Sequence, residues 1–168
     1  MPYNQSEPFQ GELLVQFHLT VETTFSAVEE ILPWFEQNCQ DWLDKNTFLQ
    51  MQIVLVEGFT NIVKYAHFGL SPQTPIQLLT RIFPNLIEIK IWDYGPEFDL
   101  SLQLQKELNT SPQIAIEKES NRGLLLMNAL SDELSYIREN HEKQAKNCLI
   151  IRKKIIAAQG DREKGGIH

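Results

Sequence analysis

The sequence contains little cysteine, and this scarcity excludes two common kinds of site. Of its 168 residues only Cys39 and Cys148 are cysteines, and their wide separation matches neither a zinc-binding nor a redox spacing. A chain of this length buries enough surface to fold without disulfides or a structural metal. We therefore expect the protein to work in a reducing compartment.

Long apolar runs are also missing from the chain. No stretch approaches the roughly 20 apolar residues that cross a bilayer. Residues 1–5 lack the basic and apolar segments of a signal peptide. These two absences favour a cytoplasmic protein.

Basic residues are also fewer than acidic ones in this sequence. Lys and Arg number 15 against 22 Asp and Glu, which gives a net charge of -7. Because an acidic protein repels phosphate backbones and anionic lipids, we expect neither direct nucleic-acid binding nor membrane binding. The remaining composition is that of a globular protein. We predict one domain over residues 1–158, followed by a disordered polar tail over residues 159–168.

The spacing of apolar residues predicts the order of the secondary-structure elements. We expect five strands, at 13–19, 76–82, 87–91, 134–138 and 148–153. Four helices are expected, at 24–42, 46–66, 101–108 and 123–130. The polar stretch 109–121 contains a proline and predicts a long loop of the kind that often serves as a lid.

Two details of the helices depend on single residues. Pro33 should kink the first helix or end its first segment. Thr47 and Gln50 have the spacing of a capping box at the start of the second helix.

The order of these elements predicts the fold class. The chain has no regular strand–helix–strand alternation, and a short turn at 83–85 joins two strands into a hairpin. Such connections favour a mixed, mostly antiparallel sheet with the helices layered on one face. We therefore expect an α+β protein that forms a two-layer α/β sandwich.

The second helix carries a polar stripe on an otherwise apolar surface. An otherwise apolar run is interrupted at spacings of three and four residues, which lie along one stripe of a helix, by Glu57, Thr60, Asn61 and Lys64. A buried carboxylate is costly without a partner, so the stripe should meet water, a ligand or a compensating charge. An ordinary exposed stripe, or a structural network between Glu57 and Lys64, would produce the same pattern.

Two further motifs are weaker when taken alone. Asp93 ends an apolar strand and is followed by Gly95, which suits close approach of a ligand but also any strand-ending turn. Asn121, Arg122 and Gly123 precede an apolar helix, where free backbone N–H groups suit phosphate but also form plain capping turns.

Together and in this order, the three motifs resemble the GHKL (histidine-kinase-like) ATPase superfamily, and most closely its branch of bacterial anti-sigma-factor serine/threonine-protein kinases. The matching segments are 56–67, 93–99, 122–127, 131–136 and 147–153. The resemblance covers about residues 10 to 154 and implies the Bergerat-type ATP-binding fold, an α/β sandwich.

The resemblance implies a role for each matching residue of the first two motifs. Asp93 would accept a hydrogen bond from the adenine amino group, and Gly95 would leave room for the purine ring. Asn61 would ligate Mg²⁺, a hard cation that prefers oxygen ligands. Glu57, one helical turn earlier, would be the general base for a protein serine hydroxyl.

The remaining cofactor-binding positions also come from the resemblance. Lys64 would face phosphate, and Arg122, Gly123 and Leu124 would form the second glycine box, whose backbone and basic residue hold the phosphates. Residues 109–121 would be the lid that closes over ATP.

The sequence departs from the family pattern at two positions. Glu97 stands where the first glycine box usually has glycine or proline, and a carboxylate there would repel phosphate or point to solvent. Asn121 stands where glycine is expected, although asparagine tolerates left-handed backbone better than most residues. We interpret His18, His67, His141 and His168 as structural or exposed.

The implied function is an ATP-binding anti-sigma-factor-type serine/threonine kinase. Its substrate would be a STAS-domain anti-sigma-antagonist protein, and its alternative partner would be a sigma factor. Switching between these partners would regulate transcription. Homodimers are usual in this branch. One alternative is a non-catalytic nucleotide-binding or partner-sequestering module of the same fold, which Glu97 favours and which Glu57 and Asn61 disfavour. The other, a histidine-kinase catalytic domain, commonly has asparagine where Glu57 stands.

Overall fold

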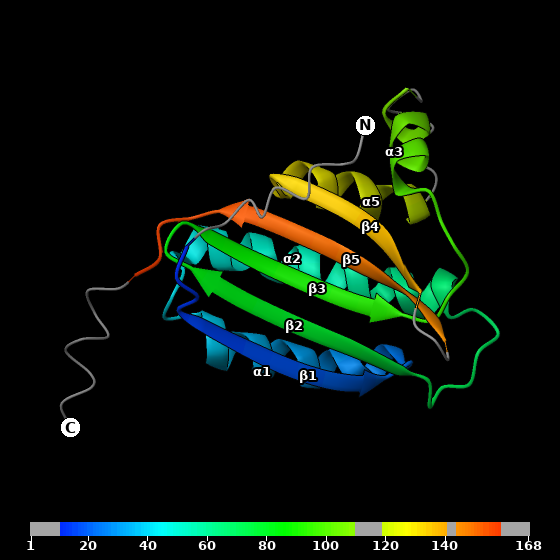
Figure 1. Cartoon of the computed structure of the whole chain (residues 1–168), viewed down its shortest axis with the longest axis horizontal. Coiled ribbons are helices and arrows are strands. Elements are labelled where there is room, and N and C mark those ends of the chain that lie inside the picture. Colours follow the sequence, from blue (N-terminus) through cyan, green and yellow to red (C-terminus); the bar gives the residue numbers. More distant parts are fainter. Residues whose placement is uncertain (1–10, 110–118, 141–143, 159–168) are drawn as a thin grey trace.

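The computed structural model describes residues 11–109, 119–140 and 144–158 (Figure 1). Its five strands are β1 (Val15–Glu22), β2 (Pro75–Phe83), β3 (Leu86–Asp93), β4 (Glu133–Asn140) and β5 (Ala145–Lys154). Its α-helices are α1 (Val28–Cys39), α2 (Lys45–Asn61), α3 (Leu100–Leu108) and α5 (Glu119–Leu130). A 3₁₀ turn, Phe25–Ala27, precedes α1, and a π-helical turn, Ile62–Ala66, continues α2.

The strands form one sheet in the order β1-β2-β3-β5-β4. Each strand pairs antiparallel with its neighbours. A two-residue turn closes the β2–β3 hairpin, because Phe83 pairs with Leu86. The predicted hairpin is therefore confirmed, while the mixed character of the sheet is not, since every pairing among the described strands is antiparallel.

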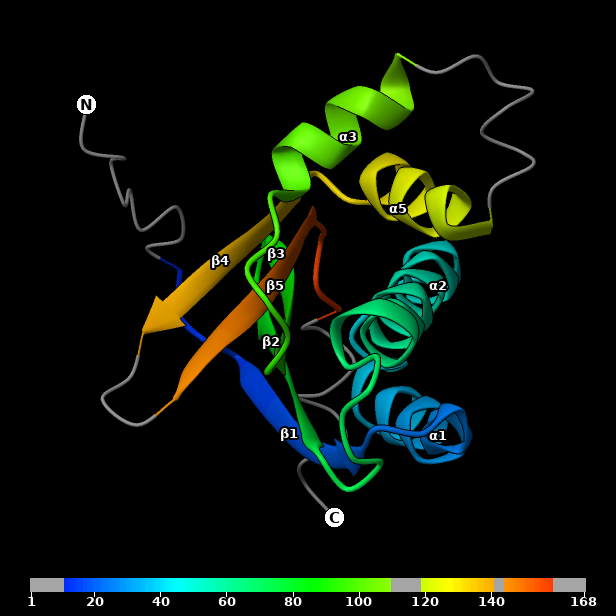
Figure 2. The ribbon, with the colours of Figure 1, turned by 90° about the vertical axis from the view of Figure 1, so that its right-hand side faces the viewer.

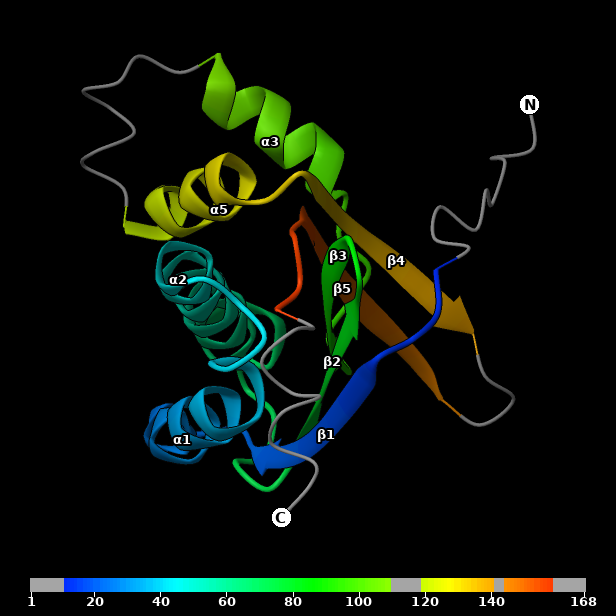
Figure 3. The ribbon, with the colours of Figure 1, turned by 90° about the vertical axis from the view of Figure 1, so that its left-hand side faces the viewer.

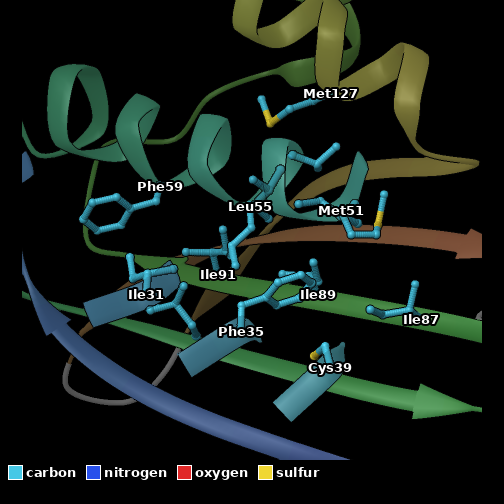
Figure 4. Close-up of a cluster of buried hydrophobic side chains, with 14 of the residues drawn as sticks. Ile31, Phe35, Cys39, Met51, Leu55, Phe59, Ile87, Ile89, Ile91 and Met127 are labelled. Atoms are coloured by element: carbon cyan, nitrogen blue, oxygen red, sulfur yellow. The ribbon is translucent and has the colours of Figure 1, made fainter. Parts of the chain in front are cut away.

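The helices lie on one face of this sheet. The two edge-on views show α1, α2 and α5 together on the same side of the strands (Figures 2 and 3). The predicted α+β two-layer sandwich is thus confirmed. Its core lies between the layers, where side chains of α1 and α2 meet those of β3 (Figure 4). The largest fully buried members include Phe35, Phe59, Met51, Ile89 and Ile91.

The start of α2 differs from the predicted capping box. Asp44 is the N-cap, and its Oδ1 accepts a hydrogen bond from the backbone N–H of Thr47 at 2.8 Å. The Thr47 hydroxyl donates to the other carboxylate oxygen at 2.8 Å. An aspartate three residues before a free N–H is already a strong cap, so Thr47 serves as the third helical residue instead.

Of the two predicted effects of Pro33, the end of a helical segment is wrong, and so is the predicted end of the first helix at residue 42. The chain stays α-helical through Pro33, whose missing N–H would have bonded the carbonyl of Glu29. Both residues are exposed, so water can satisfy that carbonyl. This helix ends at Cys39, whereas the prediction extended it to Trp42.

The loop predicted at residues 109–121 ends earlier than expected. Helix α5 begins at Glu119, four residues before the predicted start at Gly123. Most of the predicted lid (110–118), His141 and the predicted tail (159–168) lie outside the described residues.

Removing the cap of α2 should destabilise the protein by a measurable amount. We expect Asp44→Ala to lower the free energy of unfolding by about 1 kcal/mol, because the N–H of Thr47 loses its acceptor. Urea denaturation would measure the change. The matched control is Asp41→Ala in the exposed turn before the cap, which should leave the value almost unchanged; equal losses in the two variants would contradict the assignment.

Candidate functional site

A cavity of about 410 Å³ opens between the helical layer and one end of the sheet. Its walls come from α2 and its π-helical turn, the segment after β3, α3, α5, and strands β4 and β5. The lining residues are Gly58, Asn61, Ile62, Tyr65, Ala66, Pro96, Glu97, Phe98, Leu100, Gln103, Leu124, Met127, Tyr136 and Leu149. This volume is within the usual range for a small-molecule site.

Helices α2 and α5 bring two of the predicted site residues together. A Cβ atom at Gly123 would lie 2.5 Å from Glu57 Oε2 and 3.6 Å from Asn61 Nδ2. Both side chains therefore lie against the same glycine of α5. Glu57 is half-buried, and Asn61 lines the cavity. A side chain at position 123 would occupy the space that the Glu57 carboxylate now fills.

The π-helical turn changes the helical spacing after Asn61. The N–H of His67 donates to the carbonyl of Ile62 at 2.8 Å, five residues back, which widens this turn. As a result Tyr65 lines the cavity, while Lys64 is exposed and does not line it. The predicted stripe is thus interrupted after Asn61, because a regular α-helical spacing no longer applies there.

Asp93 is fully buried at the end of β3, where hydrogen-bond donors surround it. Its Oδ1 accepts from the backbone N–H of Gly95 at 2.8 Å and from the side-chain amide of Asn147 at 3.0 Å. Its Oδ2 accepts from the hydroxyl of Tyr136. Burial, followed by the charge of Asp93, raises the pKa of Tyr136, so the hydroxyl remains a donor. Tyr136 also lines the cavity, whereas Asp93 does not.

Gly95 is required by its contact with the end of α2. A Cβ atom there would lie 2.6 Å from the carbonyl oxygen of Ala66 and 2.9 Å from its Cβ. The turn after β3 therefore approaches the π-helical turn as closely as backbone allows. Asn147 holds this turn from the other side, since its amide also donates to the carbonyls of Gly95 and Pro96.

His67 anchors the same turn and is structural, as its sequence context predicts. Its Nε2 accepts the backbone N–H of Tyr94 at 2.9 Å. The hydroxyl of Thr23 donates to the carbonyl of Thr74 at 2.6 Å, so at the His67 ring it accepts from Nδ1–H at 2.8 Å. Burial lowers the pKa of His67, an effect that the charge of Asp93 partly opposes. The neutral ring with its proton on Nδ1 satisfies all these bonds.

The second predicted glycine box lies inside a helix. Because α5 begins at Glu119, the N–H of Gly123 is beyond the first four free donors of the helix. Arg122 is exposed, and Leu124 is buried and lines the cavity. Of this motif, the structure thus places Gly123 against Glu57 and Leu124 in the cavity wall, and leaves Arg122 on the surface.

The donor set fits magnesium held mainly by a ligand's phosphates and water. Among the described residues, no group of three or more His, Cys, Asp or Glu side chains is arranged to hold a metal ion. Mg²⁺ at phosphate sites needs only one or two protein oxygens. Asn61 on the cavity wall has a side-chain oxygen of this kind, and Glu57 lies one helical turn away on α2. Glu97 is exposed and also lines the cavity, which adds negative charge to its rim.

Three residues of the site were missed in the sequence. Tyr136, Asn147 and Arg138 come from β4 and β5, and together they hold Asp93 and the turn after it. Arg138 donates to the carbonyl of Gly95 at 3.2 Å and to Asn147 Oδ1 at 3.1 Å. A polar Asn147 opening an apolar strand was the available signal, but its pairing with Asp93 depends on the strand register.

Comparison with known proteins identifies a domain family and similar kinases. A model of the histidine kinase-like ATPase domain matches residues 21–153. The serine-protein kinase RsbW of Staphylococcus epidermidis is 32% identical over 91 residues, which are 53% of this chain and 57% of that protein. RsbW sequences from two strains of the same species give the same values. The chain thus spans a little over half the length of the curated relatives it matches. Separately, none of the described helices combines the length and apolarity needed to cross a membrane.

The burial of His67 predicts a pH dependence of stability. Because the folded protein lowers the pKa of His67 below its ordinary 6.5, the unfolded chain binds more protons near that pH. Stability should be fully present above pH 6.5 and fall as the pH drops through the lower folded pKa. Protonation of Nε2 would also remove the acceptor for Tyr94. Urea denaturation between pH 7.5 and 5.5 would measure the decline.

The variant that tests this effect is His67→Asn. Its control is His18→Asn, at an exposed position of β1. His67→Asn should be less stable at pH 7.5 by about 1–3 kcal/mol, because buried partners lose their bonds. It should also lose the decline between pH 7.5 and 5.5. His18→Asn should keep the wild-type profile. Parallel profiles for all three proteins would show that His67 does not cause the effect.

Proposed function

We propose that this chain, which belongs to the histidine kinase-like ATPase family, is an ATP-dependent protein serine/threonine kinase of the anti-sigma type. Its partial similarity to the serine-protein kinase RsbW supports this choice within the family. The proposed substrate is a STAS-domain antagonist protein, with a sigma factor as the alternative partner. Exchange between the two would regulate transcription.

One observation carries the proposal. Glu57 and Asn61 lie together against Gly123, beside a cavity whose far wall is the turn after the buried Asp93. A base and a polar metal ligand one helical turn apart suit in-line phosphoryl transfer, where positioning and charge neutralisation supply most of the catalysis. The mainly apolar remainder of the cavity wall, including Ile62 and Met127, suits a flat aromatic base.

In the proposed reaction Glu57 accepts the proton of a serine or threonine hydroxyl on the partner protein. The hydroxyl oxygen forms a bond to the γ-phosphorus of ATP, the bond from that phosphorus to the β,γ-bridging oxygen breaks, and ADP leaves. Mg²⁺ bound with the nucleotide would neutralise phosphate charge, and Asn61 is the residue that would hold it. Asp93 would recognise the adenine amino group, with Gly95 shaping the turn beside it.

The phosphate end of the site would depend on two exposed cations. Lys64 and Arg122 are both on the surface, so each would have to turn toward the phosphates of a bound nucleotide. Gly123 would act by leaving space for the Glu57 carboxylate, and Leu124 by contributing to the cavity wall.

A non-catalytic module that sequesters its partner is the second candidate. The exposed carboxylate of Glu97 at the cavity rim favours it, because negative charge there opposes the binding of phosphate. Measuring nucleotide binding and phosphoryl transfer separately distinguishes this module from a kinase.

Nucleotide binding is the first test. Calorimetric titration with ATP and Mg²⁺ should give a dissociation constant in the micromolar range. Asp93→Asn should weaken it by roughly tenfold or more, since a charged acceptor is lost. Asp41→Asn, in an exposed turn, is the matched control and should bind like the wild type. Absence of binding at millimolar ATP, in folded protein, would refute the proposed kinase for this chain.

Phosphoryl transfer is the second test. Glu57→Gln keeps the shape of the side chain but cannot accept the proton, so transfer from radiolabelled ATP to STAS-domain proteins should fall roughly a hundredfold or more. ATP affinity should stay within a few fold. Glu36→Gln on the exposed side of α1 is the control and should transfer normally. ATP binding without transfer by the wild type would favour the sequestering module.

A further inference from the structure

We propose that Tyr136 acts as a lock on Asp93, the carboxylate proposed to recognise the adenine base. A nucleotide must displace the Tyr136 side chain from this carboxylate in order to bind. The inference rests on the proposed ATP-binding function. Tyr136 is a cavity-lining residue, and its hydroxyl donates to Oδ2 of the fully buried Asp93. In this structure the carboxylate is therefore bonded to a side chain of the cavity wall.

The other donors to Asp93 leave Oδ2 as the only oxygen for a ligand to take. Oδ1 already accepts from the N–H of Gly95 and the amide of Asn147. Both bonds hold the backbone turn, since the same amide also bonds the carbonyls of Gly95 and Pro96. A carboxylate oxygen has about two acceptor sites, so Oδ1 is full, while Oδ2 keeps one besides the bond from Tyr136. Asp93 is fully buried and is not among the cavity-lining residues, whereas Tyr136 is, so a ligand amino group can reach Oδ2 from the cavity only when a covering side chain moves.

Tyr136 lies at the edge of the sheet, where one of its neighbours is an exposed side chain. It lies on β4, the edge strand of the sheet next to α5 and α3 (Figure 1). The ring of Phe98 packs edge-on against it with centroids 6.1 Å apart, and Phe98 is 47% exposed. Phe98 belongs to the segment between β3 and α3, which has neither helix nor strand structure. Tyr136 is partly buried and packs against the hydrophobic core, so displacing it costs that packing as well as the contact with Phe98.

The lock has a defined energetic consequence. A hydrogen bond to a charged acceptor is strong, so the closed state is favoured when no ligand is bound. When only a fraction of molecules is competent to bind, the apparent dissociation constant rises by the inverse of that fraction. Removing the hydroxyl while keeping the ring should therefore tighten nucleotide binding. If the tyrosine only supports the fold, its removal should leave nucleotide binding unchanged or weaker.

The test is calorimetric titration of the full chain with ATP and Mg²⁺, comparing wild type with Tyr136→Phe. We expect Tyr136→Phe to bind about tenfold more tightly, although its thermal stability falls. Tyr94→Phe is the matched control, because it removes the same hydroxyl from a residue that is not among the cavity-lining residues, and it should bind like the wild type.

Each outcome decides the matter. Tighter binding by Tyr136→Phe supports the lock, as does binding by this variant alone. Unchanged or weaker binding, with normal binding by the wild type, overturns the lock and leaves the proposed function intact. If neither protein binds at millimolar ATP, both proposals fail. Should Tyr136→Phe not fold, NMR of wild type with labelled tyrosine decides: the hydroxyl proton bonded to Asp93 should lose its protection at saturating ADP, and its persistence would overturn the lock.

Discussion

The burial of one negative charge, that of Asp93, is the constraint on which the site depends. A buried carboxylate is tolerated only when hydrogen bonds replace its lost water. Here the donors come from the adjoining turn and from two other strands, at Gly95, Asn147 and Tyr136. The need to satisfy one side chain therefore ties together the end of β3, the start of β5 and the middle of β4. The turn that these bonds hold forms a wall of the cavity through Pro96 and Glu97.

The opposite wall depends on glycine at helix contacts. A Cβ atom at Gly58 would lie 3.0 Å from Leu149 Cδ2, so α2 lies close against the sheet there. Gly123 has the same role between α5 and α2, where it leaves room for the Glu57 carboxylate. The two walls meet where Gly95 approaches the carbonyl of Ala66. Small residues at these three contacts thus keep the site compact while its polar groups remain aligned.

The fold class could be predicted because it depends on local patterns. Alternating apolar residues placed all five strands within a few residues, and the short turn at 83–85 indicated the hairpin. The errors occur where two alternative local structures compete for the same residues. Asp44 replaced Thr47 as the cap of α2, α5 extended one turn upstream through residues with no helix breaker, and the π-helical turn took Lys64 off the predicted stripe. Each alternative exchanges one set of local hydrogen bonds for another, so sequence patterns do not separate them.

The sequence alone determined which residues are adjacent along one element, and therefore the pairing of Glu57 with Asn61 on α2 and of Asp93 with Gly95 after β3. Contacts between elements were decided only by the tertiary structure. The register of β3 against β5 places Asn147 opposite Asp93, and the position of β4 at the sheet edge brings Tyr136 to the same carboxylate. A shift of one residue in either register would turn these side chains to the other face of the sheet. That register depends on how the whole core packs, which no local pattern encodes.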